Sequence, residues 1–188
     1  LCHGWVPQDL CEINAPVYWR SELPTCAGVA SRTQLQGSPE LKIAPTSAGE
    51  QGKPSRTQLK AMAHLFHEGC ALSLVAVRIA TGRRHQIRSH FSYVGHATVC
   101  DGKYTARATF QADLALCAQN FLHRYRLAFK DIRGIGREAM EPVPTDLVST
   151  LFRLDAKDAG SAHATRLWLI GQGPRDWRQY SRLNGCDS

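Results

Sequence analysis

The feature that most constrains this chain is a short apolar run that stops abruptly and continues as a basic, periodic segment. Residues 71–80 are almost continuously apolar, as expected of a buried strand. A Thr-Gly pair at positions 81–82 interrupts this run. Apolar residues then recur at helical spacing across residues 85–94. The pattern therefore predicts a strand, a turn and a short amphipathic helix.

The predicted helix is basic. Arg84 and Arg88 are four residues apart and are expected to share one helical face. A helix that begins after a glycine turn offers free N–H groups and a positive dipole, so this is a plausible anion site. A solvated basic helix packed on a sheet explains the same residues, and the residues alone leave both interpretations open.

The positive charge of the chain is concentrated around this segment. The net charge is +7, and residues 53–107 hold nine Lys/Arg against two Asp/Glu. The rest of the chain holds fourteen of each sign. Such a local excess favours a polyanionic partner, RNA or DNA before a membrane surface, because no long amphipathic basic helix is predicted.

Three motifs carry a family resemblance. Residues 81–90 read TGRRHQIRSH, residues 95–104 read GHATVCDGKY, and residues 121–129 read FLHRYRLAF. In order and spacing they resemble the T-G-R-[TS]-H-Q-I-R-x-H, G-H-P-I-x-G-D-x-x-Y and L-H-A-x-x-L-x-F segments of the RluA-like pseudouridine synthases. Arg84, Ala97 and Cys100 depart from that pattern, where the family has Thr or Ser, Pro and Gly.

The resemblance implies a fold and a function. The fold is α+β, with a mixed, largely antiparallel sheet and a few packed helices, incomplete at the N-terminus. The function is conversion of uridine in RNA to pseudouridine without a cofactor. The implied partner is structured tRNA or rRNA, with no DNA and no membrane, and a monomeric, intracellular protein is expected. The target uridine, the RNA class and the compartment do not follow from the sequence.

The resemblance also implies one catalytic role. The family's nucleophile is an Asp in an H-R-L-D-x-x-T-S-G segment, which we expect upstream of Leu1. Arg88 matches the arginine that pairs with this Asp, so without it Arg88 is expected to carry an unpaired charge. The alternative is a local acid, and residues 53–107 hold only Glu68 and Asp101. Residues 153–160 resemble this segment in part, which makes Asp155 a weaker catalytic candidate. A helix end capped by Gly160 is the better explanation of these residues.

The remaining candidates surround Arg88. We predict RNA contacts for five residues: Arg83, Arg84, His85, Gln86 and Lys103. We predict structural roles around the site for four more: Gly82, His90, Asp101 and Tyr104. No metal is expected, because His85 and His90 lack the cysteine or carboxylate spacing of a metal site.

The chain divides into a domain at residues 1–154 and an extension of unknown role at 155–188. Loop-like composition marks residues 21–55 as an insertion. Strands at residues 58–66 and 72–77, joined by a turn at Glu68-Gly69, predict an antiparallel hairpin.

Beyond the central motif, a strand is predicted at residues 120–131 and a helix at 146–153, whereas 110–118 shows no clear period. In the extension, Arg and aromatic residues alternate, which suits either stacking on bases or packing on the core.

The seven cysteines favour reduced thiols, because their number is odd and no C-x-x-C occurs. Two other classes compete with the enzyme. One is a non-catalytic RNA-binding module derived from the same fold. The other is a basic interaction domain within a larger assembly.

Overall fold

The computed structural model describes residues 1–19, 27–29 and 52–180, and its centre is one long β-hairpin. Strand β5 (Arg56–His67) pairs antiparallel with β6 (Cys70–Ile79). Glu68 and Gly69 both have positive φ, 48° and 79°. This is the backbone that a two-residue hairpin turn needs to match the twist of its strands. The predicted hairpin is confirmed.

Short strands complete this sheet on both sides. β1 (Cys2–His3) pairs with β6. The other edge of β5 is shared: β2 (Glu12–Asn14) pairs with its first residues, and β9 (Asp155–Ala156) pairs with Leu65 and Phe66 near its end. All these ladders are antiparallel in the described part of the chain, so the α+β class is confirmed.

A change of register divides β5 into two halves. Before it, buried and half-buried residues alternate, as expected where one face of a strand is covered. The register shifts between Ala61 and Ala63, and the next residues are buried on both faces. Such a bulge bends and twists the strand. β5 thereby passes from a half-covered region beside the central motif into the closed core.

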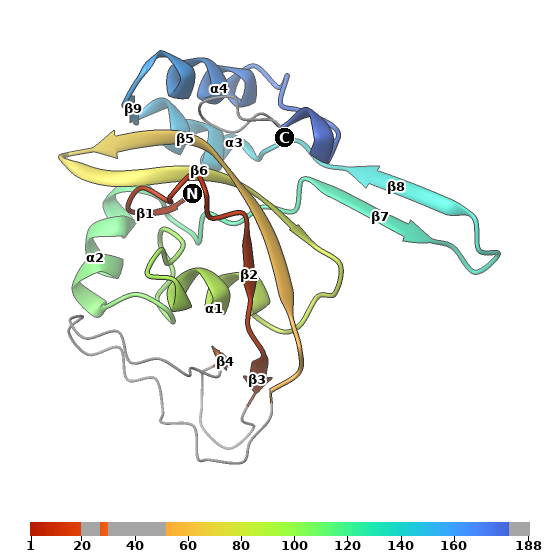
Figure 1. The fold of residues 1–188 in the computed structure, drawn as a ribbon. Coiled ribbons are helices and arrows are strands. Elements are labelled where there is room, and N and C mark those ends of the chain that lie inside the picture. Colours follow the sequence, from red (N-terminus) through yellow and green to blue (C-terminus); the bar gives the residue numbers. More distant parts are fainter. Residues whose placement is uncertain (20–26, 30–51, 181–188) are drawn as a thin grey trace.

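Helices cover both faces of the hairpin. Figure 1 shows α4 (Ala159–Leu169) above the sheet, with α1 (Gln86–Tyr93) and α2 (Arg107–Leu116) below it. α3 (Thr145–Phe152) packs against α4. Leu147 and Leu151 of α3 join the larger core cluster, and Phe91 of α1 joins the smaller one. The predicted helices near residues 85–94 and 146–153 are confirmed.

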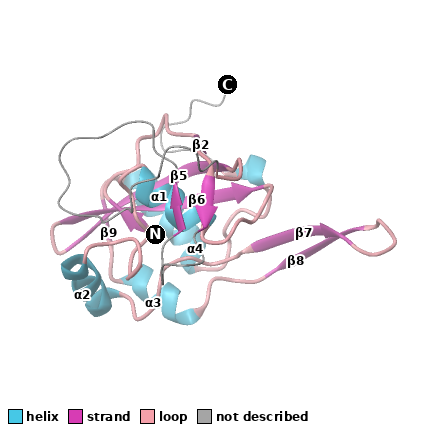
Figure 2. Cartoon of the chain, turned by 90° about the horizontal axis from the view of Figure 1, so that it is seen from below, coloured by secondary structure: helices cyan, strands magenta, loops and turns pink. Residues whose placement is uncertain are grey.

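A second hairpin leaves the body of the protein. β7 (Arg126–Lys130) and β8 (Gly136–Met140) pair only with each other among the described strands, and both are exposed along their whole length. Figures 1 and 2 show it projecting away from the sheet in both views. The strand predicted at residues 120–131 therefore exists only from Arg126 onward and lies outside the central sheet.

Two smaller elements lie near the predicted insertion. β3 (Val17–Trp19) pairs with β4 (Ala27–Val29). Apart from β4 and residues 52–55, the insertion predicted at 21–55 lies outside the described residues.

One helix escaped prediction and one predicted helix cap is wrong. Residues 107–116 form α2, although their apolar positions show no helical period. Gly160 lies inside the first turn of α4, whose N-cap is Asp158. The Asp158 side chain accepts a hydrogen bond from Ser161 N at 2.7 Å, which satisfies one of the free N–H groups of the helix start.

The segment after residue 154 packs on the same sheet. Ser161 Oγ accepts a hydrogen bond from His64 N of β5 at 2.9 Å. Tyr180 belongs to the larger core cluster, Trp168 and Trp177 pack against it, and a 3-10 turn (Trp177–Gln179) lies near the end of the described chain. These aromatic residues therefore follow the packing alternative. Among the described residues, no helix is long and apolar enough to cross a membrane.

Candidate functional site

The turn between β6 and α1 positions the central motif. β6 ends at Ile79, and α1 begins at Gln86 after His85, whose φ of 55° lies in the left-handed region. Arg84 therefore lies in the turn before the helix. The prediction that Arg84 and Arg88 share one helical face is wrong, because the chain changes direction at His85. Gly82 has no required steric role, since a Cβ there would meet no heavy atom within 4 Å.

Gln86 anchors the start of α1. Its Oε1 accepts a hydrogen bond from Arg83 N at 3.1 Å. Its Nε2 donates to Arg56 O at 3.0 Å and to Thr57 Oγ1 at 3.2 Å, both on β5. The side chain is buried and both of its polar ends are engaged inside the protein. Gln86 therefore fixes the helix to the sheet, which leaves no free group for the RNA contact predicted from sequence.

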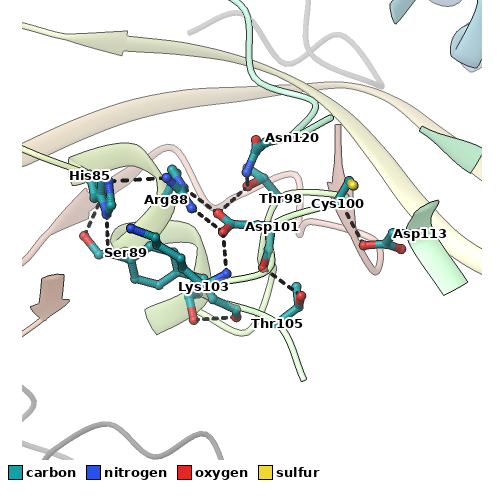
Figure 3. Close-up of polar contacts among 12 residues, drawn as sticks. His85, Arg88, Ser89, Thr98, Cys100, Asp101, Lys103, Thr105, Asp113 and Asn120 are labelled. Carbon is teal, nitrogen blue, oxygen red and sulfur yellow. Dashed lines mark hydrogen bonds and ion pairs between the residues drawn. The ribbon is translucent and has the colours of Figure 1, made fainter. Parts of the chain in front are cut away.

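Arg88 is held by a carboxylate within this chain. Its Nε donates to Asp101 Oδ2 at 2.7 Å, and its Nη2 donates to Asp101 Oδ1 at 2.5 Å (Figure 3). The Asp101 side chain is 0% exposed and that of Arg88 is 21% exposed. The expectation of an unpaired Arg88 is wrong, because a local acid, one of the two alternatives, supplies the charge.

Asp101 is fixed by further donors. Oδ2 accepts from Thr98 Oγ1 and Oδ1 accepts from Lys103 N, each at 3.1 Å. Burial raises the pKa of Asp101, but the hydrogen bond and charge of Arg88, with these donors, bring it below its ordinary value. Asp101 is therefore ionised at neutral pH and anchors the loop at residues 95–105.

Cys100, just before Asp101 in this loop, has a left-handed backbone. Its φ is 58°, at the position where the related motif has Gly. Its backbone N donates to Asp113 Oδ2 at 2.7 Å, and Asp113 also meets His3 Nε2 at 3.0 Å. Asp113 thus braces the loop from α2, behind Asp101.

His85 and Tyr104 surround the guanidinium. The Tyr104 ring lies 5.1 Å from Arg88 Cζ, a cation–π distance. His85 Nε2 lies 3.3 Å from Arg88 Nη1, and His85 Nδ1 lies 3.1 Å from Tyr104 Oη. An arginine can only donate, so Nε2 accepts and Nδ1 carries the proton. Burial, then the charges of Arg88, Lys103 and Arg84, lower the pKa of His85, which favours this neutral form.

His90 has a structural place. It is fully buried, and its Nε2 donates to Ala15 O at 3.0 Å, which ties α1 to the segment after β2. Burial lowers the pKa of His90, although the bond to Ala15 opposes this shift. The predicted structural role agrees with these contacts.

The exposed cations lie around the fixed pair. Arg83, Arg84 and Lys103 are exposed, and Asp101, the acid of the neighbouring loop, is bound to Arg88. This surface can attract an anion, while the Arg88 guanidinium beneath it is oriented and partly accessible. In the described ranges, no group of three His, Cys, Asp or Glu could hold a metal ion.

Asp155 is far from this cluster. It is exposed in β9 and pairs with Phe66 of β5, whereas α1 is tied to Arg56 and Thr57. Thr57 and Phe66 lie near opposite ends of β5, about 30 Å apart along the strand. Sequence reasoning missed two residues that hold Asp101, Thr98 and Asn120, and also Asp113, which holds the same loop at Cys100. Asn120 Nδ2 donates to Thr98 Oγ1 at 3.1 Å.

Comparisons with known proteins agree with one another. The family described as RNA pseudouridylate synthase matches residues 25–93. Ribosomal large subunit pseudouridine synthase D of Vibrio vulnificus is 37% identical over 120 residues, covering 58% of this chain and 36% of that protein. Synthase C of Haemophilus ducreyi is 30% identical over 114 residues, covering 60% and 33%. The chain thus spans about a third of the length of these relatives.

Solved structures show the same fold. Human RNA pseudouridylate synthase domain containing 1 has a TM-score of 0.61 at 22% identity, covering 88% of this chain and 62% of that chain. Human RNA pseudouridylate synthase domain containing 4 has a TM-score of 0.54 at 16% identity, covering 82% and 60%.

Proposed function

We propose that this chain belongs to the RluA-like family of RNA pseudouridine synthases and forms the part of such an enzyme that orients the catalytic carboxylate during isomerisation of uridine in RNA. In that reaction the uracil is detached from C1′, rotated and rejoined through C5. The target base has to leave its stack to be reached. Asp155 is too remote from Arg88, so we propose that the carboxylate comes from an R-L-D segment outside these 188 residues.

The observation that carries the proposal is the oriented Arg88. Two donors of its guanidinium are bound to Asp101, its face lies over Tyr104, and its side chain remains 21% exposed. A guanidinium fixed in this way can hold a second carboxylate ionised and in one orientation. A purely electrostatic RNA-binding surface requires positive charge but no such orientation.

The proposed substrate is structured RNA, ribosomal or transfer RNA, and the proposed acting form is a monomer. The exposed Arg83, Arg84 and Lys103 supply the phosphate contacts. Because neutralised phosphates release counterions, affinity for RNA should fall steeply as salt rises.

Binding to RNA tests the first half of the proposal. Arg83→Ala and Arg84→Ala should each weaken binding of the 188-residue chain to unrelated RNA sequences alike, and each should reduce the salt slope by about 1. Arg133→Ala removes the same charge from the exposed hairpin and should leave affinity unchanged. Equal affinity for RNA at low and high salt would contradict the proposal of a nucleic-acid partner.

Turnover tests the second half. The 188-residue chain alone should form no pseudouridine, and the chain joined to an upstream R-L-D-x-x-T segment should form it. Measuring pseudouridine in transcribed RNA by mass spectrometry separates these cases. Product from the shorter chain would place the nucleophile within it, whereas RNA binding without turnover in the joined chain would identify a non-catalytic RNA-binding module.

A further inference from the structure

We infer that Asp101 is a positioning residue, which binds Arg88 along one edge and so determines which of its nitrogens receive the catalytic carboxylate. The inference rests on the proposed function for the identity of that second carboxylate. The fixation of Arg88 by Asp101 stands on geometry alone and is tested separately.

The two-pronged contact fixes the plane of the guanidinium. Asp101 accepts from Nε and Nη2, one carboxylate oxygen for each nitrogen, at 2.7 and 2.5 Å. A fork-to-fork pair of this kind allows neither rotation about Nε–Cζ nor a shift along the edge without losing a bond. Tyr104 lies against the face, 5.1 Å from Cζ. Asp101 therefore fixes the guanidinium within its plane, and Tyr104 restricts its movement perpendicular to that plane.

The remaining donors have defined positions. Arginine has five N–H donors. Asp101 takes two of them, and His85 Nε2 lies 3.3 Å from Nη1. This leaves one N–H on each of the two terminal nitrogens. A second carboxylate that approaches Arg88 therefore meets Nη1 and Nη2, because Nε is already committed.

Asp101 is suited to this role because it cannot move independently. Its carboxylate accepts from Thr98 Oγ1 and Lys103 N. Its backbone carbonyl accepts from Tyr104 N at 3.1 Å and from Thr105 N at 3.0 Å. Asp101 therefore links the guanidinium of Arg88, through its side chain, to the loop that carries Tyr104, through its backbone.

A neighbouring carboxylate provides a matched control. Asp113 is also buried, and it binds Cys100 N at 2.7 Å and His3 Nε2 at 3.0 Å. Figure 3 shows it beyond Cys100, away from Arg88. Asp113→Asn therefore perturbs the same loop without removing the partner of Arg88.

The first experiment measures the Arg88 Nε–H by nitrogen-15 NMR in the 188-residue chain. In the parent protein this proton should exchange slowly with water. Asp101→Asn should accelerate its exchange about tenfold or more, since a charge-assisted bond is lost, and Asp113→Asn should leave it unchanged. Thr98→Val, which removes one donor to Asp101 without a change of charge, should accelerate it less.

Two outcomes would overturn the positioning role. One is an unchanged Arg88 signal in Asp101→Asn. The other is equal acceleration in Asp101→Asn and Asp113→Asn, which would mean that the loop as a whole shields Arg88. If Asp101→Asn does not fold, Thr98→Val compared with Asp113→Asn decides the same question.

The second experiment uses the chain joined to an R-L-D segment. Asp101→Asn should lower kcat about 10- to 100-fold with KM for RNA unchanged, because a misplaced clamp affects the reacting group rather than RNA binding. Asp113→Asn should retain parental kcat. A parent chain without turnover would overturn the proposed function, while the exchange measurement would still decide whether Asp101 fixes Arg88.

Discussion

Two arginine–carboxylate pairs in this protein have the same geometry in opposite surroundings. Arg88 binds Asp101 through Nε and Nη2 at 2.7 and 2.5 Å. Arg126 binds Glu138 through Nε and Nη2 at 2.8 and 2.9 Å, across the β7–β8 hairpin. The Asp101 side chain is 0% exposed, whereas Arg126 and Glu138 are 34% and 43% exposed.

The difference shows that contact geometry alone does not determine how much an ion pair contributes to the stability of the folded state. An exposed pair gains little, because water and salt screen it and two long side chains lose freedom. Loss of one partner from a buried pair leaves an uncompensated charge that water cannot reach. Site and hairpin should therefore respond very differently to the same substitution.

The largest effect is expected for Arg88→Ala. It leaves the fully buried Asp101 without its counter-charge, so the free energy of unfolding should fall by about 3 kcal/mol, near the lower end for buried pairs because Arg88 is partly exposed. Urea unfolding of the 188-residue chain measures this, with the exposed Arg83→Ala as control. A loss no greater than that of the control would show that Asp101 is stabilised by its other donors.

The next effect is a dependence on pH. Burial raises the pKa of Asp101, but Arg88 and the other donors bring it below its ordinary value. A depressed carboxyl pKa stabilises the folded state above the unfolded pKa of about 4, and this contribution is lost as the pH falls through the folded value. The stability gap between the parent protein and Asp101→Asn should therefore be full at pH 7 and narrow below about pH 4. A gap that is constant down to pH 2 would contradict this prediction.

The smallest effect is expected in the hairpin. Arg126→Ala should leave the midpoint of thermal unfolding unchanged within error, because its pair with Glu138 is exposed to solvent and salt. Comparing the parent and variant in low and high salt provides the control. A drop comparable to that of Arg88→Ala would mean that the hairpin is anchored through Arg126, which also lies 3.6 Å from Asp176.

Periodicity and turn chemistry predicted the elements that are specified locally. The β5–β6 hairpin follows from two apolar runs around Glu68-Gly69, and α1 follows from the spacing of its apolar residues. α2 could not be found in this way, because most of its residues are exposed and only Asp113 and Leu116 are buried. The apolar alternation of β7 predicted a strand but not its surroundings, since Leu127 and Phe129 are 41% and 48% exposed.

The site was predicted only in part for a related reason. The motif placed Arg88 on a helix, and Asp101 was already one of two local acids. The choice between them depends on the left-handed backbone at Cys100, where a non-glycine residue rarely adopts positive φ. It also depends on Asn120, which lies 22 residues after Thr98 and donates a hydrogen bond to it, so that Thr98 is held as a donor to Asp101. Local sequence patterns do not predict contacts of this kind.

The shared edge of β5 has a consequence for how the protein is made. Leu65 and Phe66 pair with Ala156 and Asp155, some ninety residues later in the chain. During synthesis this end of the strand therefore presents unpaired N–H and C=O groups until those residues emerge, and an open edge of this kind recruits strands from other molecules. A chain truncated at residue 154 would retain the whole Arg88 motif and yet be prone to self-association.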